Sequence, residues 1–122
     1  MSLEKFNIKT LRTFVPAKDY ELSRKFYKKI GFEETFYSED LAVFNVGNFS
    51  FYLQNFYQKK WAENFMMFME VENVDEFWKY LLSLSLESDF PTIKLRRPKT
   101  EDWGREFHLI DPTGVLWHFA TF

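Results

Sequence analysis

The stretch W-G-R-E-F-H-L-I-D-P-T-G-V-L-W-H-F, from Trp103 to Phe119, decides the fold of the C-terminal half. It carries both histidines of the 122-residue chain, His108 and His118, on either side of a D-P-T-G turn. The short runs before and after the turn predict two antiparallel strands joined as a hairpin. Whether the two imidazoles meet depends on the length of the turn.

The turn allows two registers. A plain two-residue turn would place His108 and His118 on opposite faces of the hairpin. Pro112 favours the first central position of a type I turn, and Gly114 can then take the left-handed conformation as a bulge, giving a three-residue loop. Only this register sorts the residues into an apolar face and a mixed face. The apolar face then carries Phe107, Leu109, Val115, Trp117 and Phe119. We therefore expect His108 to pair with His118 on the mixed face.

Two segments have the spacing of amphipathic helices. From about Asp19 to Ile30 the apolar residues share one face, Asp19 suits the N-cap position and Gly31 is a natural stop. The second helix begins after a predicted Asn73 cap. Its apolar residues recur at helical spacing, at Val74, Phe77, Trp78, Leu81 and Leu82.

The remaining segments favour short strands, expected at residues 10–15, 32–38, 41–46, 49–54, 65–71, 92–97, 105–110 and 115–120. With the helices they give the order β-α-β-β-β twice, joined by residues 56–64. We expect an α+β fold in one domain, residues 1–122, with module one at about 8–56 and module two at about 65–122. Each half offers an apolar back for a helix and an amphipathic front. Two curved mixed sheets with such fronts would enclose a cleft.

Composition narrows the classes of function. Aromatic residues make up 21% of the chain, enough to fill a core and line a pocket. The net charge of -2 and the lack of a basic stripe argue against nucleic acid. The absence of cysteine excludes disulfides and thiolate metal sites. Because no apolar run approaches about 20 residues and no signal peptide is evident, we expect a cytoplasmic protein without a membrane partner.

Three segments resemble signature sequences of the vicinal oxygen chelate superfamily, which includes glyoxalase I, extradiol dioxygenases and bleomycin resistance proteins. V-P-A-K-D-Y-E-L-S-R-K-F-Y-K-K-I-G-F, residues 15–32, is similar to the first-module signature, and V-E-N-V-D-E-F-W, residues 71–78, to the start of the second module. Residues 103–119 resemble the final signature, most closely that of the bleomycin resistance proteins. The resemblance implies paired βαβββ modules. For the bleomycin resistance branch it also implies a homodimer that exchanges elements between subunits, with two grooves at the interface.

The metalloenzymes of this superfamily use about four cleft-facing positions, which the resemblance places at Arg12, Tyr52, Met66 and His118. Only His118 is a good ligand. Arginine is permanently charged, tyrosine would have to lose a proton with a pKa near about 10, and a thioether suits soft metals. His108 could add a second nitrogen, but two ligands do not make a tight site. We therefore expect no metal and no other cofactor.

The bleomycin resistance proteins bind a cationic drug in an acidic, aromatic groove without altering it. The resemblance places that groove at Phe36, Leu41, Phe68 and Trp103. Glu70 and Glu106 are expected to face the same cleft, where they could pair with a cation. His108 and His118 could form hydrogen bonds there. Arg12 could neutralise either glutamate or bind an anionic group. The candidate ligand-binding residues are Arg12, Phe36, Leu41, Tyr52, Phe68, Glu70, Trp103, Glu106, His108 and His118.

Three hypotheses of function follow. The first is a non-catalytic, homodimeric protein that sequesters an antibiotic-like small molecule with aromatic and cationic groups in its groove. The second is a lyase or dioxygenase of the glyoxalase type, with a metal held by unusual ligands such as His108, His118 and Glu106, or metal-free with a histidine as general base. The third is an interaction module whose cleft is closed by an ion pair between Arg12 and Glu106. Trp103 and Phe36 could also serve only in packing or at a dimer interface.

Overall fold

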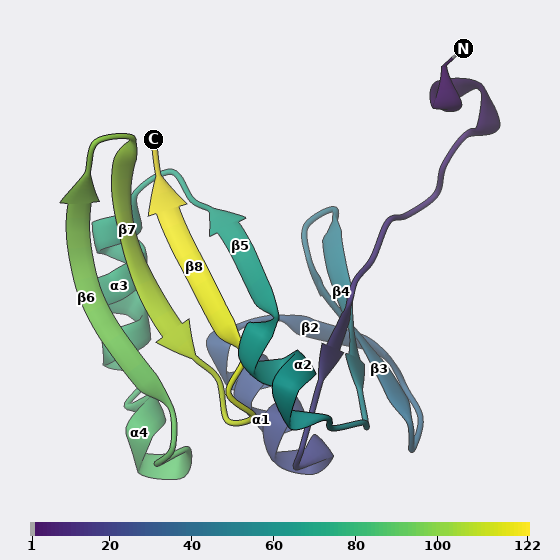
Figure 1. Cartoon of the computed structure of the whole chain (residues 1–122), viewed down its shortest axis with the longest axis horizontal. Coiled ribbons are helices and arrows are strands. Elements are labelled where there is room, and N and C mark those ends of the chain that lie inside the picture. The colour runs from purple at the N-terminus through teal and green to yellow at the C-terminus, as the bar shows by residue number, and fades with distance from the viewer. Residues whose placement is uncertain (1) are drawn as a thin grey trace.

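The computed structural model describes residues 2–122 and contains two four-stranded sheets (Figure 1). The first sheet has the order β1-β4-β3-β2 and comprises β1 (Phe14–Pro16), β2 (Glu33–Tyr37), β3 (Leu41–Val46) and β4 (Phe49–Gln54). The second has the order β5-β8-β7-β6 and comprises β5 (Met66–Glu70), β6 (Lys94–Glu101), β7 (Gly104–Ile110) and β8 (Leu116–Thr121). In each sheet one pair is parallel, β1 with β4 and β5 with β8, and the other pairs are antiparallel. The predicted α+β class with two mixed sheets is confirmed.

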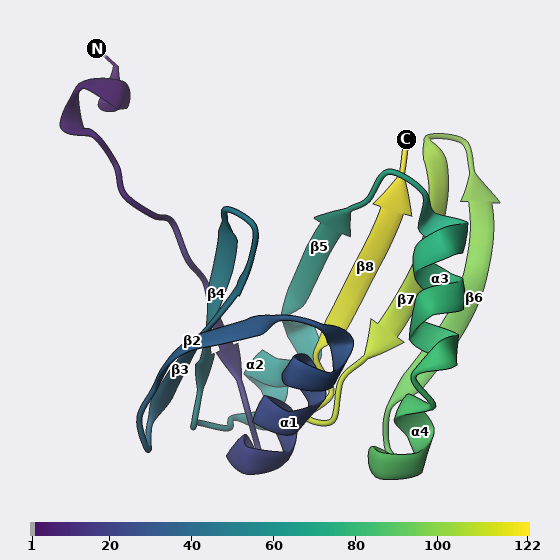
Figure 2. The same ribbon diagram turned by 180° about the vertical axis from the view of Figure 1, so that it is seen from behind.

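Two longer helices lie behind the sheets, α1 (Tyr20–Ile30) and α3 (Val74–Ser83) (Figure 2). Asp19 accepts a hydrogen bond from the Leu22 amide at 3.2 Å, and Asn73 accepts one from the Glu76 amide at 3.1 Å, so both predicted N-caps are confirmed. Three short helices were not predicted: a 3-10 turn η1 (Leu3–Phe6), α2 (Lys59–Asn64) and α4 (Leu86–Asp89).

Two strands differ from the sequence prediction by more than one residue. The first strand begins at Phe14 instead of residue 10, because pairing with β4 starts only where Phe14 lies beside Tyr52. β6 begins at Lys94 and runs on to Glu101, with an irregular register between Arg96 and Lys99. Pro98 lies inside this irregularity on an edge strand, where a residue without an amide hydrogen is tolerated.

One continuous core lies between the helices and the backs of both sheets. Tyr27 of α1 is fully buried, and its ring centroid lies 5.2 Å from that of Phe51 in the first sheet and 5.7 Å from that of Trp117 in the second. The apolar face predicted for the last hairpin is buried throughout, at Phe107, Leu109, Val115, Trp117 and Phe119. Aromatic packing of this kind joins the two halves directly.

The last hairpin has the predicted bulged register. His108 pairs with His118, the Asp111 amide donates to the Val115 carbonyl at 2.9 Å, and Gly114 has a φ of 109°. The three-residue loop therefore turns both imidazoles to the front of the second sheet, away from the helices.

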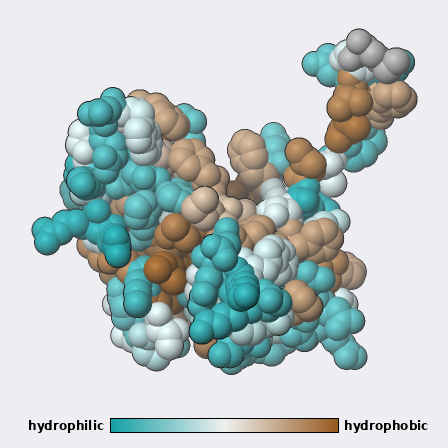
Figure 3. All heavy atoms as spheres, in the orientation of Figure 1, coloured by the Kyte–Doolittle hydropathy of each residue, from teal (hydrophilic) through white to brown (hydrophobic). Residues whose placement is uncertain are grey.

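The segment before β1 extends away from the rest of the chain as an arm, residues 2–13 (Figure 1). Its apolar side chains are exposed, and Leu11 is exposed to 92%. The space-filling view shows hydrophobic atoms along this projecting segment (Figure 3). Within residues 2–122, none of the helices has the length and apolar character that crossing a bilayer requires.

Candidate functional site

The two imidazoles meet on the front of the second sheet, where a carboxylate joins them. The ring centroids of His108 and His118 lie 4.8 Å apart with the planes at 82°. Glu106 Oε1 lies 2.6 Å from His118 Nδ1, and Glu106 Oε2 lies 3.3 Å from His108 Nε2. The Glu106 side chain is only 13% exposed, so its charge interacts mainly with these two rings. We call these three residues the histidine cluster.

An aromatic row leads away from the histidine cluster across the same face. Ring centroids are 6.5 Å apart from His118 to Phe68, 6.1 Å from Phe68 to Phe122, and 5.4 Å from Phe122 to Trp103. These separations lie within the range in which aromatic rings attract one another. All three aromatic side chains remain about half exposed or more. The row therefore offers flat apolar surface to a ligand and a polar group at one end.

A cavity of about 710 Å³ lies between the β3–β4 turn and β5, beside this row. Two predicted site residues, Phe68 and Glu70, line it. Its other walls are mainly apolar and include Val46, Phe49, Met67 and Trp117. The volume falls in the range of small-molecule sites, which are concave and mostly apolar.

Arg12 and Tyr52 contact each other on the first sheet. Arg12 Nε donates to Ser50 Oγ at 2.7 Å, Nη1 donates to the Tyr52 hydroxyl at 3.2 Å, and the guanidinium lies 5.2 Å from the Tyr52 ring centroid. Within residues 2–122, Arg12 forms no ion pair with Glu70 or Glu106. Within the described residues of one chain, Arg12 therefore neither neutralises these glutamates nor forms the ion pair that would close the cleft, and both remain hypotheses. The carboxylate of Glu106 binds the imidazoles instead.

Phe36 and Leu41 lie on the front of the first sheet, on the same face as Tyr52. Phe36 pairs with Val43, which in turn pairs with Tyr52, and Leu41 pairs with Gln54 two residues further along β4. Neither residue lines the cavity. The predicted site residues thus divide into two groups. Phe36, Leu41 and Tyr52 lie on the first sheet, and Arg12 contacts Tyr52 from the arm. Phe68, Glu70, Glu106, His108 and His118 lie on the second sheet, and Trp103 lies in the turn between β6 and β7.

The four positions that the resemblance assigns to a metal do not fit one. A guanidinium that donates to the Tyr52 hydroxyl would repel a cation. Met66 Sδ lies 3.4 Å from His118 Nε2, so one thioether and one imidazole are the only usable donors. No step of a reaction is assigned to an ion at these positions.

A buried junction under the D-P-T-G turn fixes the position of the histidines. Asp111 Oδ1 accepts hydrogen bonds from the amides of Thr113, Gly114 and Val115, each at 2.9 Å. Asp111 Oδ2 accepts from the Tyr27 hydroxyl, which itself accepts from Trp117 Nε1 at 2.9 Å. Burial raises the pKa of Asp111, and its hydrogen bonds offset part of the rise. The sequence indicated only turn chemistry at Asp111, because its partner Tyr27 comes from a distant helix.

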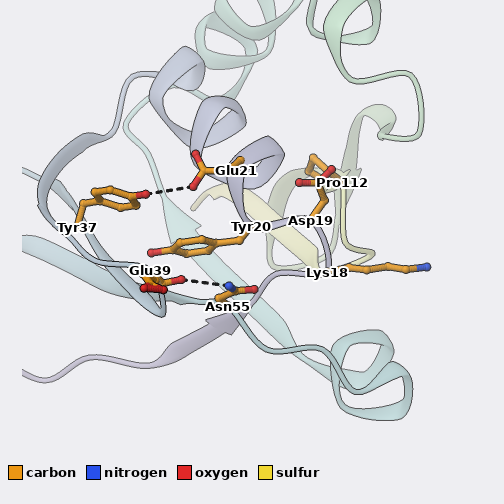
Figure 4. A pocket seen from close by; sticks show the side chains of 8 residues that line it. All are labelled: Lys18, Asp19, Tyr20, Glu21, Tyr37, Glu39, Asn55 and Pro112. Carbon is orange, nitrogen blue, oxygen red and sulfur yellow. Dashed lines mark hydrogen bonds between the residues drawn. The ribbon is translucent and has the colours of Figure 1, made fainter.

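A second hollow, of about 620 Å³, lies at the start of α1 (Figure 4). Its polar groups mostly contact one another. The Tyr37 hydroxyl donates to the Glu21 carboxylate at 3.3 Å, and the side-chain amide of Asn55 donates to the backbone carbonyl of Glu39 at 3.1 Å. Tyr20 donates to the Ser38 carbonyl, and burial raises its pKa to about 12. None of the predicted site residues lines this hollow.

Solved structures with this fold include bleomycin-binding and glyoxalase-related proteins. The bleomycin-binding protein of Streptomyces verticillus, solved with copper(II)-bleomycin, is 22% identical, and the match covers 94% of this chain and 98% of that one with a TM-score of 0.78. The bleomycin resistance determinant of transposon Tn5 is 21% identical, with 92% and 97% covered and a TM-score of 0.75. This chain shares their fold.

An enzyme has the same architecture. The lactoylglutathione lyase of Agrobacterium tumefaciens is 13% identical, with 93% and 94% of the chains covered and a TM-score of 0.69. No family model matches the sequence, and no curated protein matches it. The predicted resemblance is thus confirmed for the fold. At these identities the fold alone does not choose between a binder and an enzyme.

Proposed function

We propose that this chain is a cytoplasmic, non-catalytic small-molecule binding protein of the bleomycin resistance type. The observation that carries the proposal is the aromatic row, three half-exposed rings that end at the histidine cluster. Exposed rings in such a row can stack on a flat heteroaromatic ligand. At the end of the row, the Glu106 carboxylate can attract a cationic group and the imidazoles can exchange hydrogen bonds with it. Capture of this kind requires no metal at the positions named above.

The proposal is tested by calorimetric titration of the protein with bleomycin. We expect saturable heat and a rise in the melting temperature. Phe68→Ala should weaken binding about fivefold, because a stacked aromatic pair contributes about 1 kcal/mol. Tyr57→Ala, a half-exposed tyrosine outside the row, should leave affinity unchanged. Absence of heat and of thermal shift would remove bleomycin as the ligand. Equal weakening by both variants would contradict binding at the row.

We further propose that two copies, each a single domain of two βαβββ modules, form a homodimer that exchanges its arms and has two grooves at the interface. The predicted site residues lie on the fronts of two different sheets, so a second copy can bring the two groups together. The arm supports this, because it exposes a set of apolar side chains that a partner surface would cover. They are Leu3, Phe6, Ile8 and Leu11.

Sedimentation equilibrium tests the dimer. The full chain should sediment as a dimer, and a chain that begins at Thr13 should sediment as a monomer or associate much more weakly. The shortened chain should keep its far-ultraviolet circular dichroism, because the arm contributes no strand. A full chain that stays monomeric at high micromolar concentration would contradict the proposal.

A second candidate function is a metal-free enzyme, favoured by one contact. Glu106 Oε1 lies 2.6 Å from His118 Nδ1, a distance at which a carboxylate can orient an imidazole. Nε2 of His118 could then act as a general base. Turnover of the hemithioacetal of methylglyoxal and glutathione would support this function. The same rate with His118→Gln as with the unaltered protein would reject it.

A further inference from the structure

The histidine cluster has the composition of a transition-metal site, and it lies outside the four positions tested above except for His118. Glu106, His108 and His118 each offer one ligand atom, and these atoms all lie within 4.8 Å of one another. Two of the residues come from β7 and one from β8, so a single hairpin provides the whole set. The sequence analysis named these three residues as one unusual ligand set, and the structure places the carboxylate of Glu106 in contact with both imidazoles.

We propose that Glu106, His108 and His118 bind a borderline divalent transition ion such as Zn²⁺. Two imidazoles and one carboxylate are a known zinc ligand set, which leaves a fourth tetrahedral position for water or another donor. The inference goes beyond the proposed small-molecule binding, which is carried by the aromatic row, because it is carried by the spacing of the three ligand atoms.

The spacing of the three groups suits such an ion. Zinc bound at about 2.0–2.1 Å in tetrahedral geometry separates neighbouring ligand atoms by roughly 3.4 Å. His108 Nε2 already lies 3.3 Å from Glu106 Oε2. His118 Nδ1 lies 2.6 Å from Glu106 Oε1 and would move outward by somewhat under 1 Å. All three side chains are partly exposed, so rotation of the carboxylate and the ring can supply this movement.

An unpartnered nitrogen supports the site independently. His108 Nε2 is buried, yet it forms no hydrogen bond within the described part of the chain, because its contact with Glu106 lacks hydrogen-bond geometry. Burying a polar atom without a partner costs about 1–3 kcal/mol. An ion between this nitrogen and the carboxylate would supply the missing partner and also match the negative charge.

Two cationic residues lie beside the cluster on β6. Arg96 pairs with His108 in the sheet register and is exposed, so its flexible stem can carry the guanidinium into water. Lys99 pairs with Glu106, but its amino group lies 3.9 Å from Glu101. Since a fixed positive charge near the ion would weaken binding, Arg96→Gln should tighten it.

The test is calorimetric titration of tag-free, chelator-treated protein with zinc chloride alone. We expect one ion per chain, and with Co²⁺ in its place the intense visible absorption of a four-coordinate ion. Glu106→Gln and His108→Phe should each weaken Zn²⁺ binding by about 100-fold. Removing a residue that only hydrogen-bonds to a metal ligand already weakens binding by about 10- to 100-fold, so loss of a direct ligand should reach the upper end of that range. Glu33→Gln, an exposed carboxylate on β2, is the matched control and should change nothing.

Three results would overturn the proposal. The first is the absence of saturable Zn²⁺ binding by protein that is folded by circular dichroism. The second is equal weakening by Glu106→Gln and Glu33→Gln, which would indicate adsorption to surface carboxylates. The third is loss of binding in Met66→Leu with retention in His108→Phe, which would place the ion on the Nε2 side of His118. Because zinc alone is the probe, failure here leaves the small-molecule proposal to be judged by its own titration.

Discussion

The β3–β4 and β7–β8 hairpins occupy equivalent places in the two sheets, yet they turn differently. The β3–β4 hairpin closes through the two residues Gly47 and Asn48, both exposed, with Val46 paired to Phe49. The β7–β8 hairpin closes through three residues over a buried Asp111. One added residue changes which side chains share a face. The position of the histidines therefore depends on a turn that is anchored in the core.

The largest expected effect comes from removing that anchor. Asp111→Ala should lower the free energy of unfolding by about 3–5 kcal/mol, because three amides and the Tyr27 hydroxyl lose a buried acceptor. Asn48→Ala in the equivalent exposed turn should change it by less than about 0.5 kcal/mol. Urea denaturation measures both. Similar small losses in the two variants would show that the turns do not differ in this way.

Replacing glycine by alanine should cost different amounts of stability in the two turns, because Gly114 and Gly47 have different φ angles. An added Cβ meets no atom within 4 Å at either Gly114 or Gly47, so the cost of alanine reflects the φ angle alone. Gly114→Ala, at a φ of 109°, should cost about 2–3 kcal/mol, and Gly47→Ala, at 57° in the left-handed region, about 1 kcal/mol. Thermal unfolding of the two variants side by side gives the difference. A larger loss at Gly47 would reverse the comparison.

The smallest effect concerns the ion pairs that tie each helix to its sheet. Arg24 of α1 holds Glu34 of β2 through two 2.7 Å contacts, and these side chains are 11% and 12% exposed. Arg105 of β7 holds Asp75 of α3, but those side chains are 39% and 49% exposed. At pH 7, Glu34→Gln should lower the free energy of unfolding by about 1–2 kcal/mol, and Asp75→Asn by less.

The Glu34 pair should also depend on pH. The hydrogen bonds from Arg24 lower the pKa of Glu34 in the folded chain. The pair therefore stabilises the fold above the unfolded pKa of about 4.3, and this contribution is lost as pH falls through the lower folded pKa. The difference in free energy of unfolding between Glu34→Gln and the unaltered chain should shrink toward zero below about pH 4. A difference that stays constant from pH 7 to pH 3 would contradict the mechanism.

Local patterns predicted those features that depend on neighbouring residues. Pro112, Gly114 and the alternation around them predicted the register, and the caps at Asp19 and Asn73 predicted both longer helices. Features that depend on distant residues were missed. The role of Asp111 requires Tyr27 from α1, about eighty residues earlier in the chain. The polar contacts of Arg12 require Ser50 and Tyr52, which pattern reasoning could not place beside it.

The candidate site shows the same limit. The pairing of His108 with His118 follows from turn chemistry. Glu106 pairs with Ala120 on the neighbouring strand, and this small side chain leaves room for the carboxylate to reach both rings. Phe122, in contrast, lies beyond the last strand, where no periodicity marks its direction. It nevertheless completes the row between Phe68 and Trp103.

The unequal exposure of two tryptophans provides an optical readout for any ligand of the row. Trp103 is 46% exposed at the end of the row, whereas Trp117 is 2% exposed and its indole nitrogen donates to Tyr27. Emission from Trp103 should lie at longer wavelength and be quenched by acrylamide, and emission from Trp117 should resist the quencher. A molecule that covers the row would shield Trp103 alone, so fluorescence can screen compound libraries before any candidate ligand is known.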